Sequence, residues 1–212
     1  MIEIGKLGEN VTYTLYSDGV MTVTGSGAID VSVAQKIHNK DKILSLIIGG
    51  EVTSVVYGIF DSCPNLKTVV IGDSVEFLEE KLFEKCKSIE SVTMSFAGSS
   101  LENAASDTPR PVSHVLFGDS FTGDYIVNNG TYSHVPTCLK EITITGGTKL
   151  GAKEFLSFSS LETITIPNDM KTMYEIPELE IIQFTCPDVL TGGYSSPFQG
   201  GYDDAETDRT GV

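Results

Sequence analysis

The chain has 212 residues, and its 14 lysine and arginine residues against 29 aspartate and glutamate residues give a formal net charge of −15. A charge this negative argues against nucleic acid and anionic membrane surfaces as partners, because both bind through a positive surface. No run of about 18 apolar residues is present, so membrane insertion is not expected, and a charged content of only 20% with ample Val, Ile and Leu argues against global disorder.

The first 42 residues predict a β-hairpin and a lead-in segment. Val11, Tyr13 and Leu15 alternate with polar residues, and a second β-rich run, 20–24, follows the turn signal Asp18-Gly19. Residues 30–42 are weakly helical, and His38 within them is expected to be solvated. The opening letters, MIEIGKLGEN, lack a basic segment leading into an apolar core, so no export signal is expected in this chain.

From residue 43 onward, the pattern apolar-x-x-apolar-x-apolar recurs seven times. Its copies are Ile43-Leu46-Ile48, Leu66-Val69-Ile71, Ile89-Val92-Met94, Val112-Val115-Phe117, Leu139-Ile142-Ile144, Leu161-Ile164-Ile166 and Leu179-Ile182-Phe184. Their first residues are 23, 23, 23, 27, 22 and 18 positions apart. The period-2 apolar residues that end each copy predict a strand with one inward face. Because no copy can bury that face alone, the copies are expected to stack in parallel as a solenoid, capped at its start by the hairpin.

The segments between these strands repeat as well. Phe60 and Phe83 are 23 positions apart, as are Cys63 and Cys86, which predicts a short helical turn with inward Phe and Cys. Short second strands are expected around Val52 and Val55, Val75 and Leu78, and Gly98 and Leu101. The four cysteines form no C-x-x-C pair, so they are interpreted as small buried residues.

These residues resemble the BspA-like leucine-rich repeat proteins of bacterial surfaces. The segment VEFLEEKLFEKCKSIESVTM (75–94) is similar to the repeat unit of that family, and LGENVTYTLYSDGVMTVTGSGAI (7–29) is similar to the hairpin that precedes its first repeat. The resemblance implies a β-rich, right-handed leucine-rich repeat solenoid with stacked parallel strands, short helical turns and an N-terminal β-hairpin cap. It also implies a non-enzymatic interaction or adhesion module, located outside the cell or at its surface. Because the chain shows no export signal, a virion or cytoplasmic origin stays open.

The domain organisation predicted from these patterns has three parts. Residues 1–42 form the cap and lead-in, residues 43–184 form a solenoid of about seven rungs, and residues 185–212 form a Gly-rich acidic tail. The solenoid has an irregular insertion at 95–138, within which the fourth unit loses its Phe and Cys. Tyr194, Phe198 and Tyr202 are expected to dock the tail on the last rung or on another chain, so an oligomer formed through the tail is a further expectation.

The longest interruption, 118–138, is the candidate binding region, since insertions in repeat proteins map to loops on one face. It offers aromatic residues among small polar residues, a composition typical of adaptable recognition surfaces. The candidate partner-binding residues are Phe121, Tyr125, Asn128, Asn129, Tyr132 and His134. The alternative is that Phe121, Tyr125 and Ile126 pack inward and replace the missing Phe and Cys.

The outward strand positions form a second candidate binding face. They are expected to make one ladder, whose members are Thr68, Ser91, His114, Glu141 and Thr163. Most of the excess acid falls within the repeats, so a protein partner of this face is expected to be neutral or basic.

No pattern of catalytic, cofactor-binding or metal-ligating residues is found. The segment 146–154, GGTKLGAKE, lacks the Lys-Ser/Thr of a phosphate-binding loop. The three histidines have no metal-ligand spacing, and the acidic tail lacks a calcium-loop sequence. We therefore expect a protein partner, either from a host or bacterial surface or from the chain's own assembly. A structural component of an assembly, such as a phage virion or fibre protein, and a carbohydrate-binding module are the alternatives, the latter with a glycan as partner.

Overall fold

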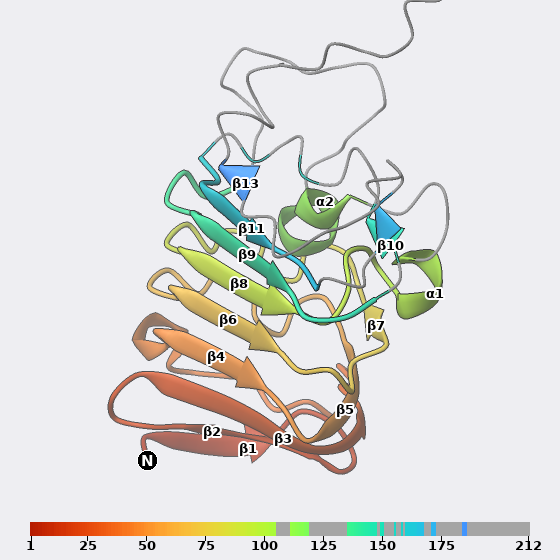
Figure 1. The fold of residues 1–212 in the computed structure, drawn as a ribbon. Helices are drawn as coiled ribbons and strands as arrows, with labels where there is room; N and C mark the ends of the chain where they lie inside the picture. The colour runs from red at the N-terminus through yellow and green to blue at the C-terminus, as the bar shows by residue number, and fades with distance from the viewer. Residues whose placement is uncertain are drawn as a thin grey trace, which may run out of the picture.

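The structure is a computed structural model that describes residues 1–104, 111–118, 135–147, 149–150, 155, 158, 160–167, 171–172 and 184–185. Its main feature is a stack of short strands that rises from the N-terminal hairpin (Figure 1). The strands of the main row run in the order β1-β2-β3-β4-β6-β8-β9-β11-β13. Their bounds are β1 Glu3–Lys6, β2 Val11–Leu15, β3 Val20–Ala28, β4 Ser45–Ile48, β6 Thr68–Ile71, β8 Ser91–Met94, β9 Glu141–Ile144, β11 Thr163–Thr165 and β13 Phe184–Thr185.

The N-terminal hairpin is confirmed, and it carries one strand more than the sequence predicted. Strands β2 and β3 pair antiparallel around a turn in which Gly19 has φ +86° and Asp18 accepts the backbone N–H of Val20 at 3.1 Å. Strand β1 adds antiparallel to β2. Residues 30–42 are not helical apart from a 3₁₀ turn at Lys40–Lys42, and His38 is exposed in a bend rather than in a helix.

From β3 to β11 the strands pair in parallel with equivalent residues in register. Leu46 of β4 lies beside Val69 of β6, which lies beside Val92 of β8. Ile142 of β9 and Ile164 of β11 continue this buried column. Each strand thus buries its inward residues against the equivalent residues of its neighbours, as the repeat predicted.

A second, shorter row of strands closes the first coils. It consists of the last part of β3, β5 (Glu51–Val55) and β7 (Phe77–Leu78), all paired in parallel. Val52, Val55, Val75 and Leu78 are buried as expected, whereas Leu101 is exposed and begins a short helix, α1 (Leu101–Ala104). Farther along the chain, β10 (Lys149–Leu150) pairs in parallel with β12 (Lys171–Thr172).

The predicted column of inward Phe and Cys residues is confirmed, but the turns that carry them are not helical. Phe60 and Phe83 are buried with ring centroids 6.5 Å apart, and Cys63 and Cys86 are buried and free. The Phe and Cys of each turn therefore fill the space between the two rows of strands.

The prediction of a fourth strand at 112–117 is wrong. Val112–Phe117 form a helix, α2, and β8 pairs directly with β9. Pro111 precedes the helix with φ −56°, and Gly118 ends it at φ +82° with its N–H donated to the carbonyl of His114 at 3.0 Å. A glycine in the left-handed conformation is a typical end of a helix. Figure 1 shows α2 at the level of β9 and β11.

The seventh predicted rung is wrong in direction. Strand β13 pairs antiparallel with β11, so Ile164 lies beside Phe184 but the chain runs the opposite way. Leu179 and Ile182 lie outside the described residues. The parallel stack within the described part of the chain therefore ends at β11.

Candidate interaction surface

The outward face of the main sheet carries a continuous ladder of uncharged β-branched residues. The register of the strands places one such residue beside the next from β1 to β11. The members are Ile4, Thr14, Thr22, Ile47, Val70, Thr93, Thr143 and Thr165. Three of them are large exposed apolar residues, with exposed fractions of 61% for Ile4, 38% for Ile47 and 37% for Val70.

A second ladder runs parallel to the first on the same face, two residues earlier in each strand. Its members are Ser45, Thr68, Ser91, Glu141 and Thr163. The Thr68 hydroxyl donates to the Ser45 hydroxyl at 2.8 Å. The predicted outward ladder is confirmed at four of its positions, but His114 does not belong to it, because that residue lies on α2.

The outward face is almost free of charge although the chain carries −15. Among the outward positions of β4, β6, β8, β9 and β11, only Glu141 is charged. The excess of acidic residues expected on this face therefore lies elsewhere. β-Branched residues suit such positions, because they pack well on the pleated surface of a sheet.

The charged residues gather one position before the strands. The Lys67 ammonium lies 2.9 Å from the Glu90 carboxylate, and Lys140 pairs with Glu162. Backbone bonds stack these four residues in the order Lys67, Glu90, Lys140, Glu162, so the two charge signs alternate along the edge. Exposed pairs of this kind contribute about 0–1 kcal/mol each, and they leave no net charge in this column.

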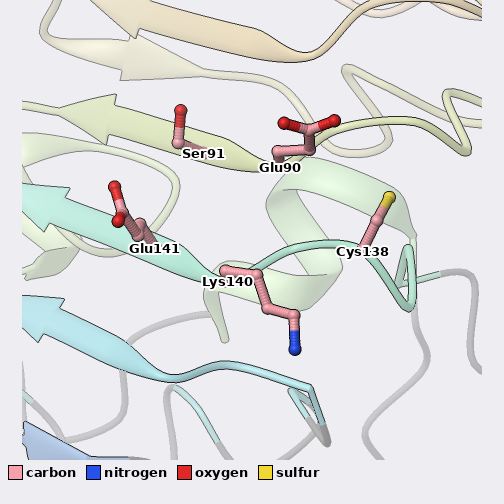
Figure 2. A pocket seen from close by; sticks show the side chains of 5 residues that line it. All are labelled: Glu90, Ser91, Cys138, Lys140 and Glu141. Carbon is pink, nitrogen blue, oxygen red and sulfur yellow. The ribbon is translucent and has the colours of Figure 1, made fainter.

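An open depression of about 340 Å³ adjoins this edge at the start of β8 and β9. Its lining residues are Glu90, Ser91, Cys138, Lys140 and Glu141. Figure 2 shows the Lys140 ammonium directed away from Glu90, in agreement with its pairing to Glu162. The Cys138 thiol donates to the carbonyls of Lys87 and Ile89 at 3.2 and 3.3 Å. Three of the five lining side chains, those of Glu90, Cys138 and Lys140, are thus held by partners in the protein.

Glu3 joins the lead-in segment to the N-terminal hairpin. Its carboxylate accepts the Tyr13 hydroxyl at 2.7 Å, the backbone N–H groups of His38 and Asn39 at 2.9 and 3.0 Å, and the Asn39 amide at 2.8 Å. Partial burial alone would raise the pKa of this carboxyl, but the four hydrogen bonds outweigh it and lower the pKa to about 2. The ionised carboxylate therefore holds the lead-in segment against β1 and β2.

Helix α2 docks on the turn that precedes Cys86. The backbone N–H groups of Leu82 and Phe83 donate to the carbonyls of Val115 and Leu116 at 3.2 and 2.8 Å. Between side chains, His114 Nε2 lies 2.8 Å from Glu80 Oε2. Phe117 contacts Phe158 edge to face at 6.5 Å. Phe117 thus supplies an aromatic ring to the interior in the unit that lacks its own Phe and Cys.

The binding residues predicted from the sequence, namely Phe121, Tyr125, Asn128, Asn129, Tyr132 and His134, lie outside the described residues. The same holds for Ile126 and for the tail aromatics Tyr194, Phe198 and Tyr202. Within the described ranges, no group of three or more His, Cys, Asp or Glu side chains could hold a metal ion. No helix there is long and apolar enough to cross a membrane.

The sequence did not reveal that the outward ladder continues from β1 across β8 to β9. Ile4 stands in a strand that the sequence did not predict. Thr143 stands beside Thr93 only because residues 112–117 leave the stack. The sequence does contain one indication of this ladder. In each strand of the main row from β1 to β11, the residue at the ladder position is Thr, Ile or Val.

Comparison with known proteins agrees with this repeat architecture. The sequence profile of the "BspA type leucine rich repeat region" matches residues 32–122 and 124–186 in six copies. No curated protein matches the sequence. Similar solved structures include a leucine-rich repeat protein from Eubacterium ventriosum, with 15% identity and a TM-score of 0.42, covering 79% of this chain and 44% of that one.

Two further structures are similar in the same way. One is a leucine rich cell surface protein from Faecalibacterium prausnitzii, with 18% identity and a TM-score of 0.32, covering 76% of this chain and 39% of that one. The other is a leucine-rich repeat protein from Bacteroides ovatus, with 21% identity and a TM-score of 0.29, covering 77% of this chain and 42% of that one. The chain thus spans less than half the length of each of the three.

Proposed function

Because the chain belongs to the BspA type leucine rich repeat region family, we propose that it is a protein-interaction module that binds through the outward face of its main sheet. We further propose adhesion as its role, at a bacterial surface, with a host or bacterial surface protein as partner. The observation that supports the site is the uncharged ladder that crosses eight neighbouring strands without interruption.

The physical basis of binding is the low desolvation penalty of this face. Burial of an unpaired charge opposes association strongly, whereas burial of Ile and Val side chains removes apolar area from water with little opposing penalty. The Thr side chains add a methyl group each, and a partner must supply hydrogen bonds to their hydroxyls. Ile47 and Val70 are paired neighbours on β4 and β6, and both are exposed apolar side chains of the ladder. The strands fix the backbone of these residues, so little conformational entropy is lost on binding.

The aromatic region predicted from the sequence is proposed as a second contact. Tyr125 and Tyr132 stand in the segment that joins α2 to β9, and they would extend the binding surface beyond the sheet. A double variant, Tyr125→Ala with Tyr132→Ala, tests that contribution separately from the ladder. A glycan array with this variant also tests the sugar-binding alternative, because a bound glycan would lose its signal.

The experiment that tests the proposed face compares two Val→Lys variants. Val70→Lys places a charge in the ladder, whereas Val31→Lys places the same charge on the lead-in segment, where Val31 is 60% exposed. Both chains are immobilised and exposed to bacterial and host surface extracts, and the captured proteins are identified and quantified. We expect the wild-type partner to be lost with Val70→Lys and retained with Val31→Lys.

Equal capture by both variants would overturn the proposed face. Binding through an uncharged face is also expected to change little when the salt concentration rises, because salt screens charge–charge attraction and not apolar burial. A steep loss of binding with salt would instead indicate that charged residues outside the ladder form the contact. Circular dichroism of both variants checks that they fold.

A further inference from the structure

Cys63 and Cys86 occupy equivalent positions in two neighbouring coils. Each stands five residues before a strand residue, and those strand residues, Thr68 and Ser91, are paired in register. Both side chains are buried and free, with exposed fractions of 0% and 1%. The two cysteines therefore face the interior one above the other.

The sulfur of Cys86 is in contact with the backbone of Cys63. The backbone N–H of Cys63 donates to Sγ of Cys86 at 3.2 Å, and the Cys86 thiol lies 3.2 Å from the carbonyl oxygen of Phe60. The adjoining backbone is tied across the same two coils, since Ser62 N–H donates to the carbonyl of Glu84 at 2.7 Å. Neighbouring strands of a sheet are about 4.8 Å apart. This spacing lies within the range of about 4.4–6.8 Å that separates the α-carbons of disulfide-bonded cysteines.

We propose that Cys63 and Cys86 are a covalent cross-linking site, at which a disulfide joins the two coils when the chain meets a disulfide donor. The donor is a small or protein-borne disulfide, RSSR. The thiolate of Cys86 attacks one sulfur of the donor and releases RS⁻, which takes up a proton, and a mixed disulfide remains on Cys86. The thiolate of Cys63 then attacks Sγ of Cys86, forms the Cys63–Cys86 bond and releases the second RS⁻. Two electrons pass to the donor, which leaves as two RSH molecules.

The surroundings favour Cys86 as the first nucleophile. Its hydrogen bonds from Cys63 lower the pKa of the Cys86 thiol, although burial opposes this, and the nearby Lys40 ammonium acts in the same direction as the hydrogen bonds. Lys40 is fixed there because it donates to the carbonyl and the carboxylate of Asp61, both at 2.8 Å. The thiolate is the species that reacts with disulfides, so Cys86 is the more reactive of the two thiols wherever the turn is formed.

Cys138 provides an internal comparison. Its thiol donates to the carbonyls of Lys87 and Ile89, outside the column of Cys63 and Cys86. A chain that keeps Cys63 with Cys138 therefore has the same number of thiols without the stacked pair. Burial of the stacked pair implies that the donor acts while the chain folds or when the turn opens.

The test uses the full chain in two matched backgrounds. The first carries Cys138→Ser and Cys186→Ser and keeps the stacked pair, and the second carries Cys86→Ser and Cys186→Ser. Each is unfolded, refolded in a mixture of oxidised and reduced glutathione, and mapped by mass spectrometry without reduction. We expect a Cys63–Cys86 peptide and the loss of two hydrogens in the first background, and free thiols in the second.

The cross-linked chain is also expected to unfold at a higher temperature than the same chain treated with dithiothreitol, because the bond restricts the unfolded state. The inference is overturned if Cys63 and Cys86 stay free after this treatment, if both backgrounds cross-link equally, or if the cross-link lowers the unfolding temperature. If the serine variants fail to fold, the same treatment and peptide mapping of the wild-type chain show whether the Cys63–Cys86 bond forms. None of these outcomes depends on the partner of the sheet face.

Discussion

The coils from β4 to β8 and the segment from β8 to β9 are built from the same apolar pattern with different results. In the first region, paired strand residues such as Ser45 and Thr68 are 23 positions apart, and each coil repeats the one below it. In the second, Ser91 pairs with Glu141, so roughly two repeat lengths of chain are used for one step of the stack. The intervening copy of the pattern forms α2 instead of a strand.

The spacing apolar-x-x-apolar-x-apolar therefore does not by itself define a strand. Val112, Val115 and Phe117 satisfy it, but the apolar Leu116 gives the same segment helical spacing as well. Pro111 stands immediately before this segment and has no N–H to contribute to a ladder, which disfavours a strand that extends through it. Gly118 did not help to distinguish the two structures, since Gly49 and Gly72 follow true strands at the same position.

The largest expected effect comes from removing the aromatic rings of the two regions. Phe83→Ala should lower the free energy of unfolding by about 3–5 kcal/mol, the usual range for a buried aromatic residue. Phe117→Ala should fall in the same range, because Phe117 is equally buried against Phe158. Denaturant unfolding measures both, and a loss below about 1 kcal/mol for Phe117→Ala would show that α2 is not part of the core.

The regular coils also depend on their cap, which Glu3→Gln weakens. We expect a loss of about 1–3 kcal/mol at neutral pH, because a charged acceptor of four hydrogen bonds becomes neutral. The pKa of Glu3 is lowered from 4.5 to about 2 in the folded chain. Its contribution is therefore present above pH 4.5 and is lost as the pH falls toward 2. Unfolding curves should show this pH dependence in the wild type and a weaker one in the variant.

Ser113→Ala is expected to stabilise the irregular region. Ser113 is fully buried in α2, and its hydroxyl oxygen has no hydrogen-bond partner among the described residues. Replacement by Ala removes this unsatisfied group and improves helix propensity, so we expect stabilisation by about 1 kcal/mol. Ser91→Ala on β8 is the matched control. A decrease in the free energy of unfolding on Ser113→Ala would contradict the burial of an unsatisfied hydroxyl in α2.

The smallest expected effect concerns the regular turns. Lys85 has φ +65°, and Ser62 has φ +57° at the equivalent position of the preceding coil. Glycine adopts this conformation without steric penalty, so Lys85→Gly is expected to change stability by less than about 1 kcal/mol, toward stabilisation. A loss well above that value in thermal unfolding would mean that the Lys85 side chain makes a contact important to the turn.

Much of the fold could be predicted from the sequence, because the regular coils satisfy several local signals at once. The hairpin has its turn residues, the strands have their period-2 pattern, and Phe60, Phe83, Cys63 and Cys86 keep a constant spacing. The helix at 112–117 could not be predicted from the same pattern, because its apolar spacing fits both structures.

The candidate surface was only partly predictable. The outward positions of β6, β8, β9 and β11 were identified from their sequence, whereas the position of His114 was wrong for the same reason that α2 was missed. The charge of the face could not be obtained from composition, because the acidic residues are distributed unevenly around the coil. The contacts of Glu3 with Tyr13 and Asn39 join distant parts of the chain and leave no local pattern.

The proposed binding face requires the uncharged ladder to be continuous from β8 to β9, and a cross-linking measurement can detect this continuity. Thr93 and Thr143 are neighbours on the outward face, whereas a strand at 112–117 would instead place Leu116 beside Thr93. Two chains are prepared, one with Thr93→Cys and Thr143→Cys and one with Thr93→Cys and Leu116→Cys, and each is oxidised and mapped by mass spectrometry. We expect a link between positions 93 and 143 and none between 93 and 116. A link between 93 and 116 without the first would contradict the structure of the face and the function proposed for it.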